Sequence, residues 1–274
     1  MSDTAAILVA TDLSARSDRA VDRAMQLAGE LHAPLVVCHA LKPGSAGAKD
    51  PAIAEAALRA ALPDPQAKVE MALPVGPAPQ AIAATADAVG AQLIVTGVAR
   101  FNCPGDYILG TAVEHLVRQA DEPVLVVKTR AHAPYRRILA ATDFSPCSLY
   151  ALKLAAAMFP DAELHLFHAW HVAYGGWSHS EELAGDTQSL AGEHLEEFLA
   201  GPDVPEGLAG RITTHLERGD FGTAMLAMLE KIDPDLVVLG THGKAGFIRS
   251  MAGSTALAAL EWVDCDALVA REPV

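Results

Sequence analysis

A loop rich in glycine is the segment of this sequence best suited to hold an anion. From Gly240 the chain runs glycine, two residues, Gly243, nine residues and then Gly253-Ser254. Glycines let backbone amides approach a phosphate closely, and a helix that begins after Gly253 would point its free N–H groups at the same anion. Ser254 adds a hydroxyl. No Gly-x4-Gly-Lys-Ser/Thr occurs and no Gly-x-Gly-x-x-Gly opens the first helix, so we expect a phosphate site that is neither a P-loop nor a dinucleotide fold.

Two other groups should lie at the same edge of a sheet as this loop. Asp143 directly follows one apolar run, and the pair His168-Ala169 ends another. A doubly wound sheet binds its ligands at the carboxyl ends of its strands, which is where all three segments are expected. Asp143 could there accept hydrogen bonds from ribose or adenine donors.

The segments that position these groups occur twice in the chain. The run Ile7–Ser14 recurs as Ile138–Ser145 with six of eight positions identical, and His39-Ala40 has its partner in His168-Ala169. One duplication, with about fourteen residues inserted in the second copy between His168 and Gly240, explains these pairs. The repeated histidine favours a shared structural role.

Strand and helix patterns alternate within each copy, which predicts an α/β fold. We expect two doubly wound domains, residues 1–130 and 136–274, each a five-stranded parallel sheet with helices on both faces. Expected strands are Ile7–Thr11, Leu35–Leu41, Lys68–Leu73, Gln92–Thr96, Val124–Lys128, 138–142, 163–170, 211–217, 235–239 and 267–271. Expected helices of the first copy include Ala52–Leu62, Pro79–Val89 and Thr111–Gln119. We expect Ser14 to cap the first helix, and Ser145, followed by Pro146, to cap its counterpart.

Charge is distributed unevenly over the 274 residues. The net charge is −14, of which residues 1–136 contribute −2 and residues 137–274 contribute −12. This acidity argues against nucleic acid or an anionic membrane as a partner. The sequence has no evident signal peptide or membrane span, and its four cysteines form no Cys-x-x-Cys. These features predict a cytoplasmic protein with reduced thiols.

Taken together, the motifs resemble the universal stress protein (UspA) family in its tandem form. The resemblance rests on Thr142-Asp143-Phe144-Ser145, on His168, on Asp233–Gly240 and on the glycine loop, and it spans essentially the whole chain. It implies adenine nucleotide alpha hydrolase-like domains that bind ATP in some members. Carried over by position, Asp143 would contact the nucleoside and Ala169 would line the adenine site. The ribose and phosphates would be held by Gly240, Gly243, Gly253, Ser254 and Thr255.

The resemblance also implies partners. We expect ATP or ADP, with or without Mg²⁺, in the second domain. The family pairs two such domains through their last strands, here Val124–Lys128 and Ala267–Arg271, so that one chain supplies both halves. A homodimer is a further expectation.

The first copy departs from the motif. Its loop begins at Gly97 and ends at Gly110-Thr111, but Arg100 replaces the second glycine, and the loop holds Pro104 and Asp106. Asp106 is a poor neighbour for a phosphate. Arg100 could supply a charge where an amide is lost, or its side chain could fill the pocket.

Two groups of residues in the second copy allow more than one interpretation. Zinc could be held by His171 or His179 with a carboxylate from residues 181–197, although surface histidines are the interpretation we favour. Trp170, Tyr174 and Trp177 are expected in the loop after the second strand, where they would cover a flat ligand or pack the inserted helix.

The expected function is therefore binding, not catalysis. No nucleophile–base arrangement is visible by spacing, and Asp143 alone does not make a kinase or ATPase site, so only weak ATP hydrolysis is conceivable. We expect a cytoplasmic stress response with ATP bound in the second domain. The alternative is a ligand-binding, zinc-binding or scaffolding stress protein with a vestigial ATP motif.

Overall fold

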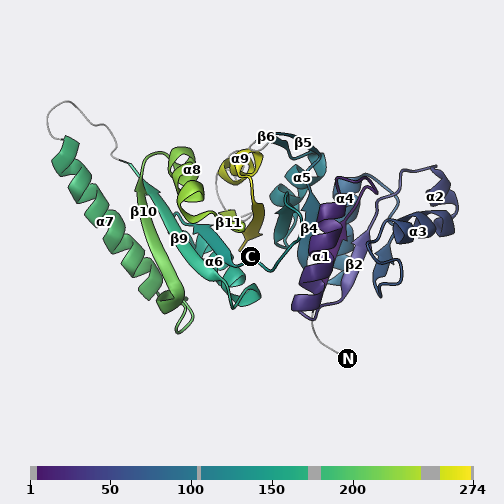
Figure 1. Ribbon diagram of the computed structural model, residues 1–274, viewed down its shortest axis with the longest axis horizontal. Coiled ribbons are helices and arrows are strands. Elements are labelled where there is room, and N and C mark those ends of the chain that lie inside the picture. Colours follow the sequence, from purple (N-terminus) through teal and green to yellow (C-terminus); the bar gives the residue numbers. More distant parts are fainter. Residues whose placement is uncertain (1–4, 104–105, 172–179, 242–253, 273–274) are drawn as a thin grey trace.

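The fold is built around one continuous sheet of ten strands (Figure 1). The computed structural model describes residues 5–103, 106–171, 180–241 and 254–272. Side chains are described except at 100–108, 180–184 and 254 within those ranges. The strand order is β10-β9-β8-β11-β12-β7-β4-β1-β2-β3. This order is two copies of one doubly wound half, joined side by side.

Each half has five parallel strands. The first half comprises β1 (Ala6–Ala10), β2 (Leu35–Cys38), β3 (Glu70–Ala72), β4 (Ala91–Gly97) and β7 (Val124–Val127). The second comprises β8 (Arg137–Ala141), β9 (Glu163–Trp170), β10 (Ile212–Arg218), β11 (Leu236–Thr241) and β12 (Asp266–Arg271). Central strands such as β1, β2 and β7 are buried along their whole length, as their continuous apolar runs predict for strands covered on both faces. The expected fold class is confirmed.

Helices cover both faces of the sheet. One face carries α1 (Asp18–Glu30), α3 (Pro51–Ala60), α6 (Pro146–Met158) and α7 (Ser180–Ala200). The other carries α4 (Ala78–Val89), α5 (Thr111–Gln119), α8 (Phe221–Ile232) and α9 (Ser254–Trp262). The short helices α2 (Ala46–Lys49) and η1 (Ala209–Arg211) complete the set among the described residues. Each face has its own apolar core, and both cores run through the two halves.

The halves join through their last strands. β7 and β12 pair antiparallel, with Leu268 opposite Leu125 at the centre of the contact. This confirms the pairing that the family resemblance implied. Because every strand of one half is antiparallel to every strand of the other, the carboxyl ends of the two halves lie at opposite edges of the sheet.

Two local expectations were wrong. Ser14 does not cap α1, which begins at Asp18, because the Ser14 hydroxyl donates to Asp12 instead (2.6 Å) and a turn follows. In the second copy Pro146 presets the helical φ, and Ser145 does cap α6, as expected. Trp170 is not in a loop: it ends β9 and is buried against Ala191 of the inserted helix α7. Tyr174 and Trp177 lie outside the described residues.

The loop of the first copy contains two short strands. It forms a hairpin of β5 (Arg100–Cys103) and β6 (Asp106–Ile108), a separate two-stranded sheet. The chain approaches this hairpin through a bond from the Ala99 amide to the Leu109 carbonyl (3.2 Å). The backbone of β6 lies next to α9 of the second half.

Candidate functional site

A cavity of about 530 Å³ opens at the carboxyl edge of the second half. Four of the seven residues assigned from the sequence line it: Asp143, Ala169, Gly240 and Thr255. They come from the ends of β8, β9 and β11 and from the first turn of α9. Ser254 begins α9, but its side chain is not described, and Gly243 and Gly253 lie outside the described residues. The fold thus brings together every assigned side chain it describes, and their roles toward a ligand stay predictions.

Asp143 is held by a turn that the local sequence dictates. Thr142 is buried and its hydroxyl bonds to that of Ser148 in α6 (2.9 Å) while it accepts from the Phe144 amide (2.9 Å). The Ser145 amide donates to one Asp143 carboxylate oxygen (3.1 Å). The exposed carboxylate is therefore fixed in direction where it borders the cavity, which is what recognition of a hydroxyl pair requires.

His168 has a structural task. Its Nδ1 lies 2.8 Å from the Thr142 carbonyl oxygen, and because a carbonyl only accepts, Nδ1 carries the proton. The ring also stacks on Phe144, with centroids 4.2 Å apart. In the first copy the Nδ1 of His39 makes the same bond to the Thr11 carbonyl (2.9 Å). The shared structural role expected from the repeat is confirmed for this histidine pair.

Gly240 is a glycine for reasons of packing. A Cβ at this position would lie 2.7 Å from backbone atoms of Cys147 and Ser148 in the first turn of α6. Real side chains do not approach backbone that closely, so β11 and α6 can pack here only without one. Gly97 is the counterpart in the first copy, where a Cβ would meet the Arg16 carbonyl oxygen at 3.3 Å.

Asp220 is a cavity residue that was not predicted from the sequence. This residue lines the cavity from the end of β10 and caps α8, accepting from the amide and the hydroxyl of Thr223 (3.1 and 2.7 Å). These hydrogen bonds lower the pKa of Asp220. The signal is Gly219-Asp220 after the third predicted strand, whereas the predicted site residues come from the ends of the first, second and fourth strands.

The described lining of this cavity is acidic. It contains two carboxylates, Asp143 and Asp220, and neither lysine nor arginine. Lys244 and Arg249 of the glycine loop lie outside the described residues.

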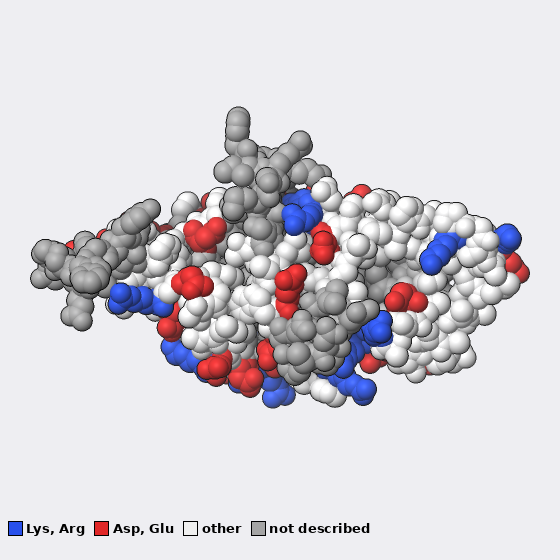
Figure 2. All heavy atoms as spheres, turned by 90° about the horizontal axis from the view of Figure 1, so that it is seen from above, with Lys and Arg blue, Asp and Glu red and all other residues white. Residues whose placement is uncertain are grey.

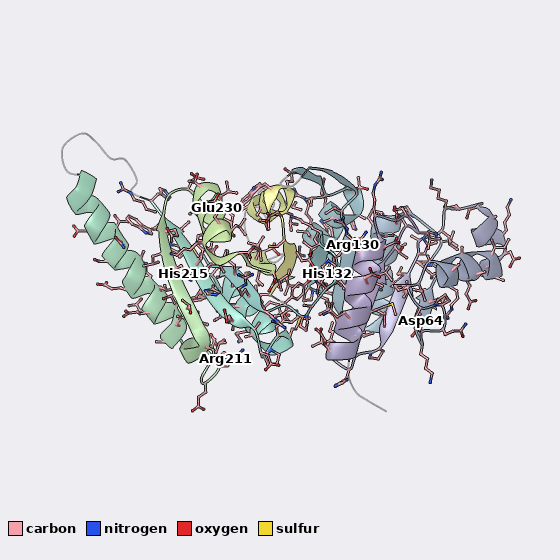
Figure 3. All side chains as sticks on the ribbon, in the orientation of Figure 1. Asp64, Arg130, His132, Arg211, His215 and Glu230 are labelled. Carbon is pink, nitrogen blue, oxygen red and sulfur yellow. The ribbon has the colours of Figure 1, made fainter. Side chains whose placement is uncertain are left out.

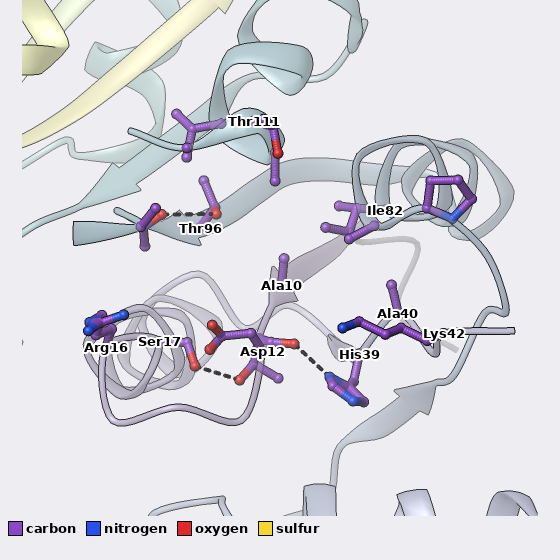
Figure 4. Close-up of a pocket in the computed structure, with 18 of the residues that line it drawn as sticks. Ala10, Asp12, Arg16, Ser17, His39, Ala40, Lys42, Ile82, Thr96 and Thr111 are labelled. Atoms are coloured by element: carbon purple, nitrogen blue, oxygen red, sulfur yellow. Dashed lines mark hydrogen bonds between the residues drawn. The ribbon is translucent and has the colours of Figure 1, made fainter. Parts of the chain in front are cut away.

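The first half contains a corresponding cavity of about 850 Å³ (Figure 4). Its lining repeats the second cavity position by position: Asp12, His39, Ala40 and Gly97 take the places of Asp143, His168, Ala169 and Gly240. Arg100, expected to fill this pocket or to charge it, lies in β5, and its side chain is not described.

The described histidines do not form a metal-binding site. The described residues contain no group of three or more His, Cys, Asp or Glu side chains arranged for a metal ion. His171 lines the second cavity, and His179 lies outside the described residues. His165 of β9 and His215 of β10, the latter labelled in Figure 3, bond to each other instead (3.1 Å). Burial lowers the pKa of both rings.

The described thiols are buried. Cys38, Cys147 and Cys265 are free, and burial raises the pKa of Cys38 to about 11 and raises that of Cys265 further. Raised values disfavour the reactive thiolate.

Surface charge agrees with the acidic composition. Lysine and arginine are interspersed with aspartate and glutamate on the face seen in Figure 2, without a continuous basic field. Within the described part of the chain, no helix is both long and apolar enough to cross a bilayer.

Comparison with known proteins decides the family. A model described as the universal stress protein family matches residues 4–128 and, a second time, residues 134–271. The chain belongs to the universal stress protein family. Universal stress protein Rv2623 of Mycobacterium tuberculosis is 27% identical over 232 residues, which cover 80% of this chain and 73% of that protein. Universal stress protein MJ0531 of Methanocaldococcus jannaschii is 30% identical over 148 residues, 51% of this chain and 84% of its own length.

A solved structure extends the fold comparison to the whole chain. The universal stress protein from Archaeoglobus fulgidus DSM 4304 covers 98% of this chain and 99% of its own length, with a TM-score of 0.64 at 18% identity. The sequence matches cover each half separately. The structural comparison shows that the whole chain has the same fold as a solved universal stress protein.

Proposed function

We propose that this chain is a tandem universal stress protein of the cytoplasm that binds ATP or ADP in its second domain, residues 136–274. The observation that carries the proposal is the meeting of Asp143, Ala169, Gly240 and Thr255 around one cavity, since the family resemblance implies a nucleotide contact for each of them. A cavity of about 530 Å³ is within the usual range for a small-molecule site.

Each group has a part in this proposal. Asp143 accepts from the ribose hydroxyls, and the small side chain of Ala169 leaves room for the flat face of adenine. The α9 N-terminus and the loop from Gly240 to Gly253 hold the phosphates through amides. Mg²⁺ fits as a companion of the phosphates, because it binds mainly phosphate oxygens, water and one or two carboxylates, and it would offset the two carboxylates of the lining.

Binding, not turnover, is the role we propose. Two of the cavity-facing groups that could act as base or nucleophile already serve the fold: Nδ1 of His168 bonds to a carbonyl, and the Ser148 hydroxyl bonds to Thr142 and to the Ser145 carbonyl. Occupancy by nucleotide would then be the signal that a stress partner reads.

The test is nucleotide binding by the full chain. Native mass spectrometry of freshly purified protein should show ATP or ADP; a zinc mass or an apolar ligand would support the alternative function instead. Calorimetric titration with ATP and Mg²⁺ should show at least a tenfold weaker affinity for Asp143→Ala, because a charged acceptor is lost. Asp203→Ala, which removes an exposed carboxylate of the same domain, is the control and should bind normally. Unchanged affinity in Asp143→Ala would refute the assignment.

A further inference from the structure

Phe144 follows Asp143 directly and has an unusual backbone conformation. Its φ is 64°, in the left-handed region that a bulky residue rarely adopts. Its amide donates to the Thr142 hydroxyl (2.9 Å), which holds the turn. Leu13 of the first copy has the same conformation (φ 62°) and the same bond to Thr11 (3.0 Å). The two copies therefore share the turn after the aspartate and differ in the side chain that it carries.

The ring of Phe144 contacts both the cavity wall and the inserted helix α7. It stacks on His168, a residue that lines the cavity, with ring centroids 4.2 Å apart. It also packs against two rings of α7, those of Phe198 and His194, at centroid distances of 5.7 and 6.1 Å. The leucine at position 13 has no ring for such a stack, so this link belongs to the second copy.

Helix α7 is attached to the sheet along a narrow apolar seam. It lies beside β9 and β10, at the end of the sheet (Figure 1). Within residues 185–200, the buried or half-buried apolar side chains that pack on the sheet are Ala191, Leu195, Phe198 and Leu199. Their spacing puts them on one face of the helix. A helix with so few buried contacts can open locally at a small cost, and one of these contacts, Phe198, is the one that reaches Phe144.

We infer that Phe144 is a positioning residue for the proposed nucleotide site, through which the packing of α7 sets the affinity of the second cavity. The inference rests on the function proposed above and adds a means of regulating it. With α7 in place, Phe198 supports the Phe144 ring against His168, and the turn that carries Asp143 is held ready for a ligand. With α7 displaced, the ring loses this support, and a ligand must order the turn as it binds, which weakens binding. Coupling of this kind is reciprocal, so bound nucleotide should in turn hold α7 in place.

Calorimetric titration of the full chain with ATP and Mg²⁺ tests the link. Phe144→Leu removes the ring but installs the residue that this chain itself has at the equivalent turn, so the variant should fold. It should bind ATP about five- to tenfold more weakly. Phe198→Ala should weaken binding about threefold or more, although Phe198 does not line the cavity. The two effects should not add in the double variant, because both act through one contact.

Hydrogen exchange of residues 195–200 is a second readout, which a general loss of stability would not move in the same way. Saturating ATP should slow amide exchange in this part of α7 in the unaltered chain. The slowing should disappear in Phe144→Leu, even at ATP concentrations that fill its weakened site.

The control is Ile232→Ala, which removes a half-buried apolar side chain from the far end of α8, on the other face of the same half. It should lower thermal stability and leave the affinity within about twofold. Unchanged affinity in Phe198→Ala, additive effects in the double variant, or ATP binding that does not slow exchange in α7 would each overturn the inference and leave the proposed function standing. Failure of the unaltered chain to bind ATP would overturn the proposed function, and this inference with it.

Discussion

Asp266 should contribute more to stability than any other carboxylate described here, and its replacement by alanine tests how the two halves are joined. It opens β12 and is fully buried (0% exposed). One oxygen accepts from the amides of Lys128 and Thr129 and from the Thr129 hydroxyl (2.8, 2.9 and 2.9 Å). The other accepts from the Tyr135 hydroxyl (2.6 Å) and faces Nε of Arg23 at 3.3 Å. One carboxylate of the second half therefore bonds both to residues of the 128–136 linker between the halves and to helix α1 of the first half.

The expected loss of stability follows from the buried groups that Asp266→Ala leaves without a partner. Arg23 is 4% exposed, and its Nε has no hydrogen-bond partner, so the ion pair with Asp266 is its compensation at that atom. Arg23 also lies over the Tyr135 ring (4.3 Å to the centroid) and donates to Ala133. Breaking a buried ion pair from one side costs about 3–5 kcal/mol, and stranded buried donors add to this without simple additivity. We expect Asp266→Ala to lose at least about 4 kcal/mol, a large share of the roughly 5–15 kcal/mol that proteins have.

Asp266→Asn separates charge from shape, because the amide oxygen can still accept from Lys128 and Thr129. It should cost less than Asp266→Ala, about 2–3 kcal/mol. The control is Asp233→Asn, which breaks an exposed pair with Arg137 (2.9 Å; the Asp233 side chain is 85% exposed) and keeps a residue that tolerates the left-handed φ of 49°. An exposed pair of this kind contributes about 0–1 kcal/mol.

The assay is equilibrium unfolding in urea, followed by circular dichroism, with limited proteolysis of the 128–136 linker as a second readout. Faster cleavage of the linker in Asp266→Ala, together with the larger loss of stability, is the expected result. A loss below about 1 kcal/mol, or one no larger than that of Asp233→Asn, would refute the reasoning that this carboxylate holds the halves together.

Two further predictions concern the second domain. Gly240→Ala should lower stability by about 1–3 kcal/mol in thermal unfolding, because the new Cβ would meet backbone of Cys147 at 2.7 Å. Gly185→Ala is the control: the space around Gly185 in α7 is open, so this change should leave stability unchanged or raise it. Equal effects of the two changes would count against the close-packing argument. The His165–His215 pair should make the free energy of unfolding fall as the pH drops from about 7 to 5. Burial lowers both pKa values in the folded protein, so the unfolded chain binds more protons in this window. The loss of stability ends below the folded-state pKa values. Urea midpoints across this range check it, and replacing both rings by glutamine should flatten the profile, while His132→Gln should not.

The sequence predicted most of the sheet because the repeat supplied each strand twice. Buried parallel strands appear as short apolar runs, and a run such as Ile7–Ala10 is more trustworthy when Ile138–Ala141 repeats it. Chemistry-bearing residues then followed from position, since Asp143 and Ala169 end such runs. Asp220 was the exception: its strand, β10, was predicted over 211–217, but the corresponding residue of the first copy is Pro77, so the repeat did not mark the position.

Other features could not be predicted, for physical reasons that differ. Ser14 and Ser145 have the same local signal, and only the proline after Ser145 decides which one caps. From the sequence alone, Lys128 would be placed on the surface after an apolar strand. In the structure it is 1% exposed, and burial lowers its pKa to about 8. Its ammonium group donates to the Val263 carbonyl and its backbone amide to the Asp266 carboxylate, and both partners come from the other half of the chain. Propensity and periodicity describe neighbours in sequence and carry no information on such contacts.

Duplication within one chain explains why the two cavities were free to diverge. In a pair of identical single-domain chains, any change in one loop appears in both, so a hairpin that packs on the partner would cost both binding sites. Here β7 and β12 join the halves permanently, and β6 lies against α9 of the other half while the second loop keeps its glycines. Arg16, Lys42 and Pro77 could then change the charge of the first cavity without altering the second. The contrast in net charge, −2 against −12, runs in the same direction, because the described lining of the first cavity holds Arg16 and Lys42 beside Asp12 and belongs to the near-neutral half.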